Sequence, residues 1–476
     1  MALVGDARQD RTQTVRPEGL GFAGLYAQAL GAMAPPYNCI VVGSVVVTFA
    51  SQDTASAFFL AGIAMLFYGG TVVSLADDLR SCGGLYFMVS RILGQRVGLW
   101  FGGALVINGL FTIPATIASA AYLLQLIAEV AMPGTVAARS WVFWVALLTP
   151  LAFLISYLGT EVSTRVVLGI LASGTAAILV LVVCIVRKLG ISALHWHSVL
   201  PAVGGNHADT MLAVGVAVLA LAGGESALFL SAEARNPKRH IPLAIYGSLG
   251  AASLLYVVTS LAFSSALPSQ ALADIWGKGG PAVVRVLGDE YVGNGFASIT
   301  LALVAASAIA GVISFTNYVS RVMLAMSRDG SLPKGWQAMN GWGTPWITVT
   351  VLGLGTVTSF LFAYFLLGDS LEAALTYFTW LYFGVTLFVL FNYVLICICA
   401  INNGRRTNRS FVRTYFAPAV TIGVMVLAMK AEFTPIPPHP FDLAVWLAAS
   451  LMVALGIYAE VTVRSGRIRY DDVSSQ

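Results

Sequence analysis

Charged residues are scarce in this sequence. Asp, Glu, Lys and Arg make up 10% of its 476 residues, whereas a typical soluble domain has about 25%. Hydrophobic residues make up 58%. So little charge cannot cover the surface of a water-soluble protein of this length. The composition therefore excludes an ordinary globular domain and predicts a polytopic membrane protein.

Cysteines are few, and the motifs of catalysis are missing. The five cysteines have no metal-ligand spacing and stand at Cys39, Cys82, Cys184, Cys397 and Cys399. Buried thiols act as small hydrophobic groups, so no disulfide framework is expected. We find no nucleophile–base pair, no cluster of metal ligands and no nucleotide-binding loop. The sequence predicts neither an enzyme nor a bound cofactor or metal.

Long apolar stretches dominate what is present. A membrane-spanning helix needs about 20 mostly apolar residues. The candidate spans are Gly21–Ala50, Thr54–Ala76, Val97–Ala128, Ser140–Leu158, Val166–Val186, Met211–Ala232, Ile241–Ala266, Tyr291–Ser320, Pro345–Leu367, Ala373–Ile401, Thr414–Met429 and Leu443–Ala459. The last two are short, so ten to twelve spans are expected. Because the short alternating segments of transmembrane barrels are absent, an all-α bundle is predicted.

The basic residues predict the orientation of the bundle. Cytoplasmic loops are rich in Lys and Arg. With twelve spans and both termini in the cytoplasm, 20 of the 26 Lys and Arg residues fall in cytoplasmic segments and 6 in outer ones. This asymmetry predicts a multi-pass protein of the plasma membrane with both termini cytoplasmic. It also accounts for the net charge of +4 without a nucleic-acid partner. The polar stretch that ends at Glu18 lacks the apolar core of a signal peptide.

Two spans carry residues that interrupt a helix. The first holds Pro35-Pro36, and proline removes a backbone donor and clashes with the preceding turn. The sixth holds Gly223-Gly224, which lower the cost of a break. If spans one to five and six to ten form two halves of opposite orientation, the breaks occupy corresponding positions, which indicates an inverted-repeat transporter. The expected organisation is a cytoplasmic segment over 1–19, repeats over 20–188 and 207–404, two further helices within 411–464, and a cytoplasmic tail over 465–476.

Glu225 follows the second break and is the only charged residue in the span Met211–Ala232. A carboxylate at membrane depth is costly and usually faces a cavity. The half-helix after Pro36 would direct its positive N-terminus at the break, and the half-helix that ends near Ala222 would offer unpaired carbonyls. Together they could hold a zwitterion, with Glu225 beside its ammonium group or acting as a proton acceptor. The alternative is a flexible kink with Glu225 bonded to a neighbouring helix.

Three motifs carry a resemblance to a known family. The segment GGESALFLSAEARNPKRHIPLAI from Gly223 is similar to the signature of amino acid–polyamine–organocation (APC) permeases, and SRVMLAMSRDGSLPKGW from Ser320 and CGGLYFMVSRILGQRVGLWFG from Cys82 resemble two further motifs of these permeases. The resemblance covers the first ten spans in order. It implies a LeuT-type fold with a 5+5 inverted repeat and two extra C-terminal helices, twelve transmembrane helices in all.

The sequence departs from the family pattern at the first break. Relatives commonly have a Gly-rich break whose free N–H groups hold the substrate carboxylate, but Pro35 and Pro36 have no N–H. Donors would have to come from Tyr37, Asn38 or Cys39. The aromatic gate common in span six is replaced by Leu219, Leu221 and Gly224, which predicts a wider pocket, and span five lacks the Lys of some proton-coupled relatives.

From the breaks and the resemblance together we predict a substrate site. Its residues are Ala34, Pro35, Tyr37, Asn38, Leu221, Ala222, Gly223, Gly224, Glu225, Asn317 and Tyr382, with Glu225 also the candidate for proton coupling. Asn108 and Tyr377 are further polar groups within apolar spans. For Asn108, Asn317, Tyr377 and Tyr382 the alternative is a hydrogen bond between helices.

The function predicted is secondary active transport of amino acids or related amines by alternating access. The partners would be the small-molecule substrate, the lipid bilayer, and either a proton or an exchanged solute. The first alternative keeps the fold and changes the solute to a polyamine, another organic amine or a nucleobase-like compound. The second is a membrane sensor that does not transport, which would have no need of paired interrupted helices.

Overall fold

The protein is a bundle of long helices. The computed structural model describes residues 19–78, 84–200, 208–278, 280–293, 295–407, 409–433 and 442–465. The long and medium helices are α1 (Phe22–Met33), α2 (Pro35–Ala50), α3 (Thr54–Asp78), α5 (Gln95–Ala131), α7 (Trp141–Tyr157), α8 (Thr160–Leu189), α9 (Ala208–Ala220), α10 (Pro237–Ala266), α13 (Phe296–Arg328), α14 (Trp346–Leu367), α15 (Leu371–Arg406), α16 (Ala417–Phe433) and α17 (Asp442–Arg464). Short helices join them: α4 (Gly84–Leu93), α6 (Val136–Arg139), α11 (Ser269–Leu272) and α12 (Ala282–Tyr291).

The helices reproduce the predicted spans. Among the described residues, ten helical stretches are long and apolar enough to cross a membrane. The first of them, Phe22–Ala76, contains two predicted spans, which the short 3₁₀ turn η1 (Ser51–Asp53) separates. The predicted fourth span is the apolar helix α7, which has 17 residues. The all-α membrane architecture is confirmed.

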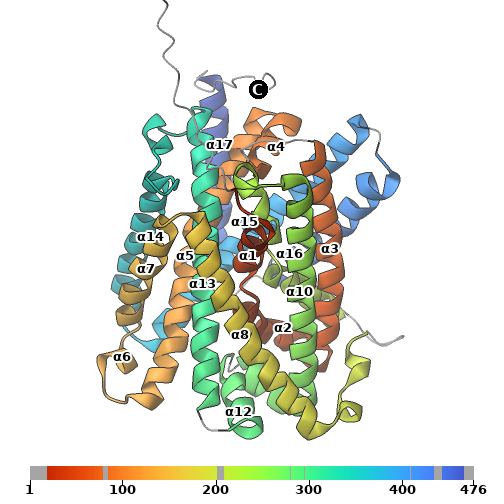
Figure 1. The fold of residues 1–476 in the computed structure, drawn as a ribbon, viewed down its shortest axis with the longest axis vertical. Helices are drawn as coiled ribbons and strands as arrows, with labels where there is room; N and C mark the ends of the chain where they lie inside the picture. Colours follow the sequence, from red (N-terminus) through yellow and green to blue (C-terminus); the bar gives the residue numbers. More distant parts are fainter. Residues whose placement is uncertain are drawn as a thin grey trace, which may run out of the picture.

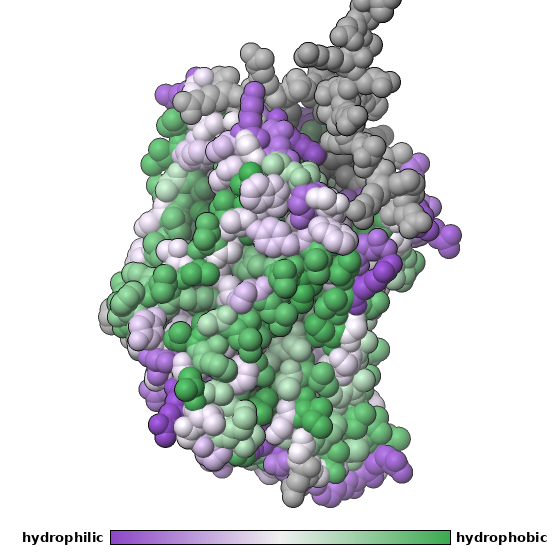
Figure 2. Space-filling model, turned by 60° about the vertical axis from the view of Figure 1, so that its left-hand side comes forward, coloured by the Kyte–Doolittle hydropathy of each residue, from purple (hydrophilic) through white to green (hydrophobic). Residues whose placement is uncertain are grey.

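The surface agrees with a bilayer environment. In Figure 2 apolar residues form a broad green band around the middle of the molecule, and hydrophilic residues gather at its upper and lower ends. On α14 the side chains of Leu354 and Phe365 are 63% and 82% exposed. Exposure of large apolar side chains carries no free-energy cost when the surroundings are lipid rather than water, because lipid tails are equally apolar.

Loops and short helices distinguish the two ends of the bundle. Figure 1 shows α4 and the C-terminal end of α17 at the upper end, and α6 and α12 at the lower end. The helices α1 and α2 lie near the middle of the bundle. The long helix α5 packs against both α13 and α15, and α10 packs against α3. The two interrupted spans are enclosed by this frame.

The interrupted spans pack against each other. The half-helix α2 packs on α9, and α1 packs on the 3₁₀ segment η4 (Gly224–Glu233) that continues the second interrupted span. Each upper half therefore meets the upper half of the other span, and each lower half meets the lower half. This places both breaks at the same depth, as the pairing of Pro35-Pro36 with Gly223-Gly224 predicts.

Candidate functional site

The first break consists of a single residue. The helix α1 ends at Met33 and α2 begins at Pro35, with Ala34 between them in the left-handed region at φ 38° and ψ 61°. Such a conformation is uncommon for a residue with a side chain. Pro35 and Pro36 are the first residues of α2, where fixed φ angles favour a helix start and a missing N–H costs nothing. The prolines therefore end one helix and begin the next, as predicted.

The second break is longer. The helix α9 ends at Ala220, and a turn leads through Gly223 at φ 103° into η4. A Cβ on Gly223 would lie 2.9 Å from the Ala32 Cβ and 3.2 Å from the Ala32 carbonyl carbon and oxygen. Both the backbone conformation and this close approach to α1 require glycine. The break predicted at Gly223-Gly224 is confirmed.

Side chains join the two breaks. The Asn38 amide donates to the Met33 carbonyl (2.7 Å) on its own span and to the Ala220 carbonyl (3.2 Å) on the other. The Ala220 carbonyl also accepts from the Tyr256 hydroxyl of α10 (2.8 Å). On the far side of the turn, the Gly223 N–H donates to the Tyr393 hydroxyl of α15 (3.1 Å). The backbone groups that the breaks release are thus satisfied by protein side chains, as an apolar environment requires.

The N-terminus of α2 has no free amide at Tyr37 or Asn38. Both N–H groups donate to the Ala34 carbonyl, at 2.9 and 3.0 Å. Because Pro35 and Pro36 carry no N–H, the first four residues of α2 offer no unbonded backbone donor. In this structure neither amide is free for a substrate carboxylate, and a contact of Tyr37, Asn38 or Cys39 with the substrate stays a prediction. Both amides are bonded for a local reason: the sharp turn at Ala34 brings its carbonyl under them.

Glu225 lines a small cavity next to the second break. The cavity has a volume of about 30 Å³, enough for water but too small for an amino acid. Its polar side chains include Asn108 of α5, Asn392 and Tyr393 of α15, and Tyr318 of α13. The Glu225 Oε2 lies 3.4 Å from the Tyr393 hydroxyl. Ala222 and Gly223 contribute to the wall. This arrangement can accept a proton or balance a bound cation.

Asn392 lines the same cavity. Its side chain is 2% exposed, and within the described part of the chain neither its amide nitrogen nor its amide oxygen has a hydrogen bond. Leaving a buried polar group unpaired costs about 1–3 kcal/mol. Such a group next to Glu225 is well placed to contact a bound solute or water.

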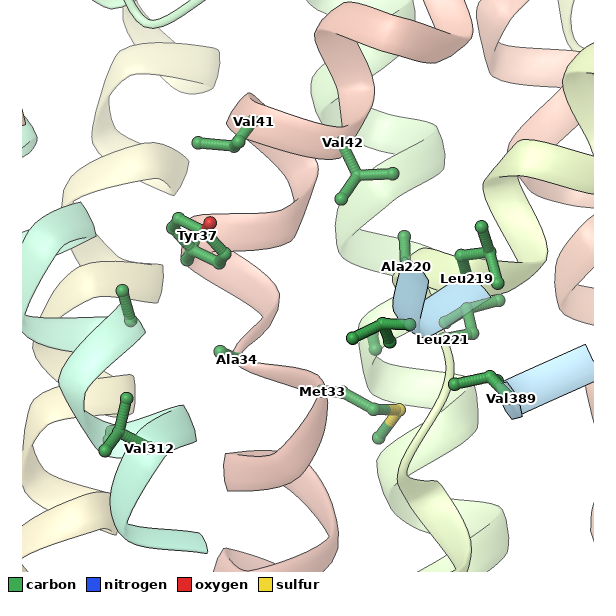
Figure 3. Packing of buried hydrophobic residues seen from close by; sticks show 14 of the residues in the cluster. Met33, Ala34, Tyr37, Val41, Val42, Leu219, Ala220, Leu221, Val312 and Val389 are labelled. Atoms are coloured by element: carbon green, nitrogen blue, oxygen red, sulfur yellow. The ribbon is translucent and has the colours of Figure 1, made fainter. Parts of the chain in front are cut away.

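The surroundings of the first break are mostly apolar. Figure 3 shows Ala34 with Val312 of α13 on one side. On its other side are Leu221, in the turn after α9, and Val389 of α15. Leu221 is fully buried, and Tyr37 is 5% exposed. The Tyr37 hydroxyl has no hydrogen-bond partner among the described residues. The breaks therefore meet in apolar surroundings with a few polar groups, a composition typical of small-molecule sites.

Of the eleven predicted site residues, Ala222, Gly223 and Glu225 line the cavity and the other eight do not, Asn317 and Tyr382 among them. The Asn317 amide donates to the Ser163 hydroxyl of α8 (3.0 Å), which is a hydrogen bond between helices. The ring of Tyr382 packs on Phe378, with ring centroids 5.5 Å apart. Neither residue lines the cavity. Their roles as substrate contacts stay predictions.

Sequence reasoning missed several residues that the fold brings to the breaks. The missed residues are polar groups within apolar spans: Asn392, Tyr393 and Tyr256. The same signal indicated Asn108 and could have indicated these three residues as well. Sequence reasoning also missed an ion pair at the upper end, where the Arg321 Nε lies 2.6 Å from Glu233 Oε1 and the Arg321 side chain is 7% exposed. The Thr160 hydroxyl donates to the other oxygen of Glu233.

Comparison with protein families gives one match along nearly the whole chain. The family described as "Amino acid permease" matches residues 20–458. This range contains both interrupted helices and all the cavity residues. It supports the resemblance that the motifs around Glu225, Ser320 and Cys82 indicate.

Individual relatives are distant. The chain is 27% identical to the branched-chain amino acid permease of Lactococcus lactis over 322 residues, 64% of this chain and 67% of that protein. It is 27% identical to the cadaverine/lysine antiporter of Escherichia coli over 174 residues, 35% of this chain and 38% of that protein. It is 23% identical to the methylthioribose transporter of Bacillus subtilis over 317 residues, 62% of this chain and 64% of that protein. The last two matches span less than two thirds of those relatives' lengths.

A solved structure shares the fold. The manganese transporter of Eremococcus coleocola superimposes with a TM-score of 0.55 at 14% sequence identity, over 93% of this chain and 94% of that chain. At this identity the similarity concerns the fold alone. It agrees with the LeuT-type architecture that the motifs imply.

Proposed function

This chain belongs to the amino acid permease family, and from that premise we propose that it carries amino acids or related amines across the plasma membrane by alternating access. The transporter would be oriented with both termini in the cytoplasm. The excess of Lys and Arg in the segments at the upper end supports this orientation. The upper end of Figure 1 would then be the cytoplasmic end.

The observation that carries the proposal is the meeting of two broken helices beside a partly buried carboxyl group. Asn38 bonds to a carbonyl on each side of this junction, and Glu225 lines the adjoining cavity. A structural bundle has no need of interrupted helices, whose released backbone groups must each find a partner. A transporter uses them to place charge and polar groups at mid-membrane.

Contacts at both ends of the junction support alternating access. At the upper end, the Leu20 N–H donates to the Glu233 carbonyl (2.6 Å), and Glu233 pairs with Arg321. At the lower end, the Trp276 indole donates to the Ile40 carbonyl (3.0 Å), and its ring fills the space next to Gly43. Opening either set of contacts would connect the junction to one side of the membrane. The cavity of about 30 Å³ would widen in the process.

The backbone at the first break favours an amine over an α-amino acid. An amino acid needs donors for its carboxylate, and the Tyr37 and Asn38 amides already bond to Ala34. Glu225 provides the complementary charge for an ammonium group. The second candidate substrate class is therefore an organic amine without a carboxylate. The relatives' names include both classes, since one names branched-chain amino acids and another names cadaverine and lysine.

Uptake into proteoliposomes tests both candidates. Purified protein would be assayed with pairs of solutes that differ only by a carboxyl group: leucine with isopentylamine, and lysine with cadaverine. Uptake of the amino acid of a pair and not the amine supports an amino acid permease, and the reverse supports an amine carrier. Uptake of neither, with ligand-dependent thermal stabilisation, would point to a sensor instead. Stabilisation by roughly 2.7 kcal/mol is expected at 100 times the dissociation constant.

A matched pair of glycine variants provides the control. Gly223→Ala would force a Cβ against Ala32 at a positive φ angle and should abolish uptake. Gly169→Ala adds the same methyl group to α8, where no atom lies within 4 Å of the new Cβ, and should transport normally. Equal transport by the two variants would show that the junction is not the transport site.

A further inference from the structure

A second, larger pocket opens on the side of the bundle. It has a volume of about 490 Å³ and lies between α3, α10, the N-terminal end of α16 and the short segment η7 (Val412–Phe416). It shares no residue with the cavity next to Glu225. Figure 1 shows α3 and α10 side by side along the height of the molecule. We call this pocket the lateral groove.

One face of α3 forms the floor of the lateral groove. Ile63, Phe67, Gly70 and Ser74 recur at intervals of four, three and four residues, which places them in a row along the helix. Gly70 leaves space between α3 and α10, because a Cβ at this position would lie 3.0 Å from the Tyr246 hydroxyl on α10. The floor is apolar except at Ser74, near the upper end.

The lateral groove is about as long as one leaflet of a bilayer is thick. From Ile63 to Ser74 the helix rises by about 16 Å at roughly 1.5 Å per residue. Half of a hydrocarbon core of about 30 Å is about 15 Å. The volume also falls in the range of roughly 300–1,000 Å³ that small-molecule sites occupy. These dimensions suit one extended acyl chain.

A positive charge stands at one end of the lateral groove. Arg413 of η7 lines it and is exposed, and within the described residues no hydrogen bond or ion pair engages its side chain. The segment η7 follows the upper end of α15, and Phe416 packs on Phe67 of α3 with ring centroids 5.5 Å apart. Arg413 precedes Phe416 by three residues and is nearer to the end of α15, so it lies on the upper side of this contact.

Three more arginines shortly precede Arg413: Arg405 and Arg406 at the end of α15, and Arg409 in the loop before η7. Arg405 stays close to η7 through its Nε, which lies 3.3 Å from the Tyr415 hydroxyl. Clusters of basic residues next to a membrane span, and basic pockets between spans, attract the head groups of anionic lipids. Charge at one end and an apolar floor along the rest match the two parts of a phospholipid.

We propose that the lateral groove binds one anionic phospholipid, with an acyl chain along α3 and the phosphate group against Arg413. This site is distinct from the transport site and does not depend on which solute is carried. A partner helix is a poorer occupant, because its apolar face would leave Arg413 without a counter-charge. A second copy of the chain would bring a second arginine to a symmetric contact.

Lipid titration of the delipidated protein tests the proposal. Native mass spectrometry would measure binding of dioleoyl-phosphatidylglycerol and of dioleoyl-phosphatidylcholine, which have the same acyl chains and differ in charge. We expect the wild-type protein to retain one phosphatidylglycerol more tightly than the rest. Arg413→Ala should weaken that site about fivefold, the factor equivalent to about 1 kcal/mol for one basic residue at a membrane surface. Arg406→Ala removes an exposed arginine at the end of α15 that does not line the groove and should change binding less than Arg413→Ala.

A second pair of variants tests the apolar part. Val73→Trp would fill the groove and should remove the tight lipid, whereas Val357→Trp puts the same ring on an exposed part of α14 and should not. Soluble glycerol phosphate should not compete. Equal affinity for both lipids, or equal effects of Arg413→Ala and Arg406→Ala, would overturn the proposal. So would a dimer that Val73→Trp abolishes while the lipid preference persists.

Discussion

The side chain of Asn38 should hold the two breaks together, and its replacement measures how strongly. Asn38→Leu removes the donor to the Met33 carbonyl (2.7 Å) and to the Ala220 carbonyl (3.2 Å). A buried group left without its partner costs about 1–3 kcal/mol. Ala220 keeps the Tyr256 hydroxyl as a partner, so the loss there is nearer the net value of a hydrogen bond, about 0.5–1.5 kcal/mol. The expected loss in free energy of unfolding is about 2–4 kcal/mol.

Asn392→Leu is the matched control for this experiment. It makes the same chemical change at a buried asparagine whose amide has no partner within the described residues. Removing an unpaired polar group costs no hydrogen bond, so the free energy of unfolding should stay the same or rise by up to about 1–3 kcal/mol. Titration with sodium dodecyl sulfate in mixed micelles would measure both variants. Equal stabilities of the two variants would refute the assignment of Asn38 as the link between the breaks.

Three further outcomes follow from the site and its surroundings. Glu225→Gln keeps the shape of the side chain and removes its charge. If Glu225 carries the coupled proton, the pH dependence of uptake should flatten while solute exchange persists. If Glu225 binds the ammonium group, the binding free energy should weaken by about 1.5–3 kcal/mol. Unchanged affinity together with an unchanged pH profile would make Glu225 structural. Arg321→Met should destabilise the protein by about 1.5–3 kcal/mol, because it removes the charge-assisted bond to Glu233, which is 34% exposed. Adding Glu233→Gln should recover part of that loss in a double-mutant cycle. In intact cells, a membrane-impermeant thiol reagent should label Lys278→Cys and leave Lys238→Cys unlabelled, and the reverse pattern would invert the orientation.

The sequence alone determined the bundle and the places where two of its helices break. Length and apolarity of the spans are local properties of the chain, and a helix in lipid has no other way to satisfy its backbone. The effects of the break residues are also local. Pro35 and Pro36 have no backbone N–H, and Gly223 and Gly224 can adopt positive φ angles. The motif that begins at Gly223 could indicate the family because its residues are contiguous in the sequence.

The tertiary structure decided which groups meet at the breaks. Asn38, Tyr256 and Tyr393 come from three spans far apart in the sequence, and only packing brings them to the carbonyl of Ala220 and the amide of Gly223. No spacing rule shows that the Ala34 carbonyl accepts hydrogen bonds from the backbone N–H groups of both Tyr37 and Asn38. Asn392 became a candidate only when its amide proved to be buried without a partner next to Glu225. Whether a polar group is free for a ligand depends on all its neighbours in space, and the order of residues along the chain does not specify them.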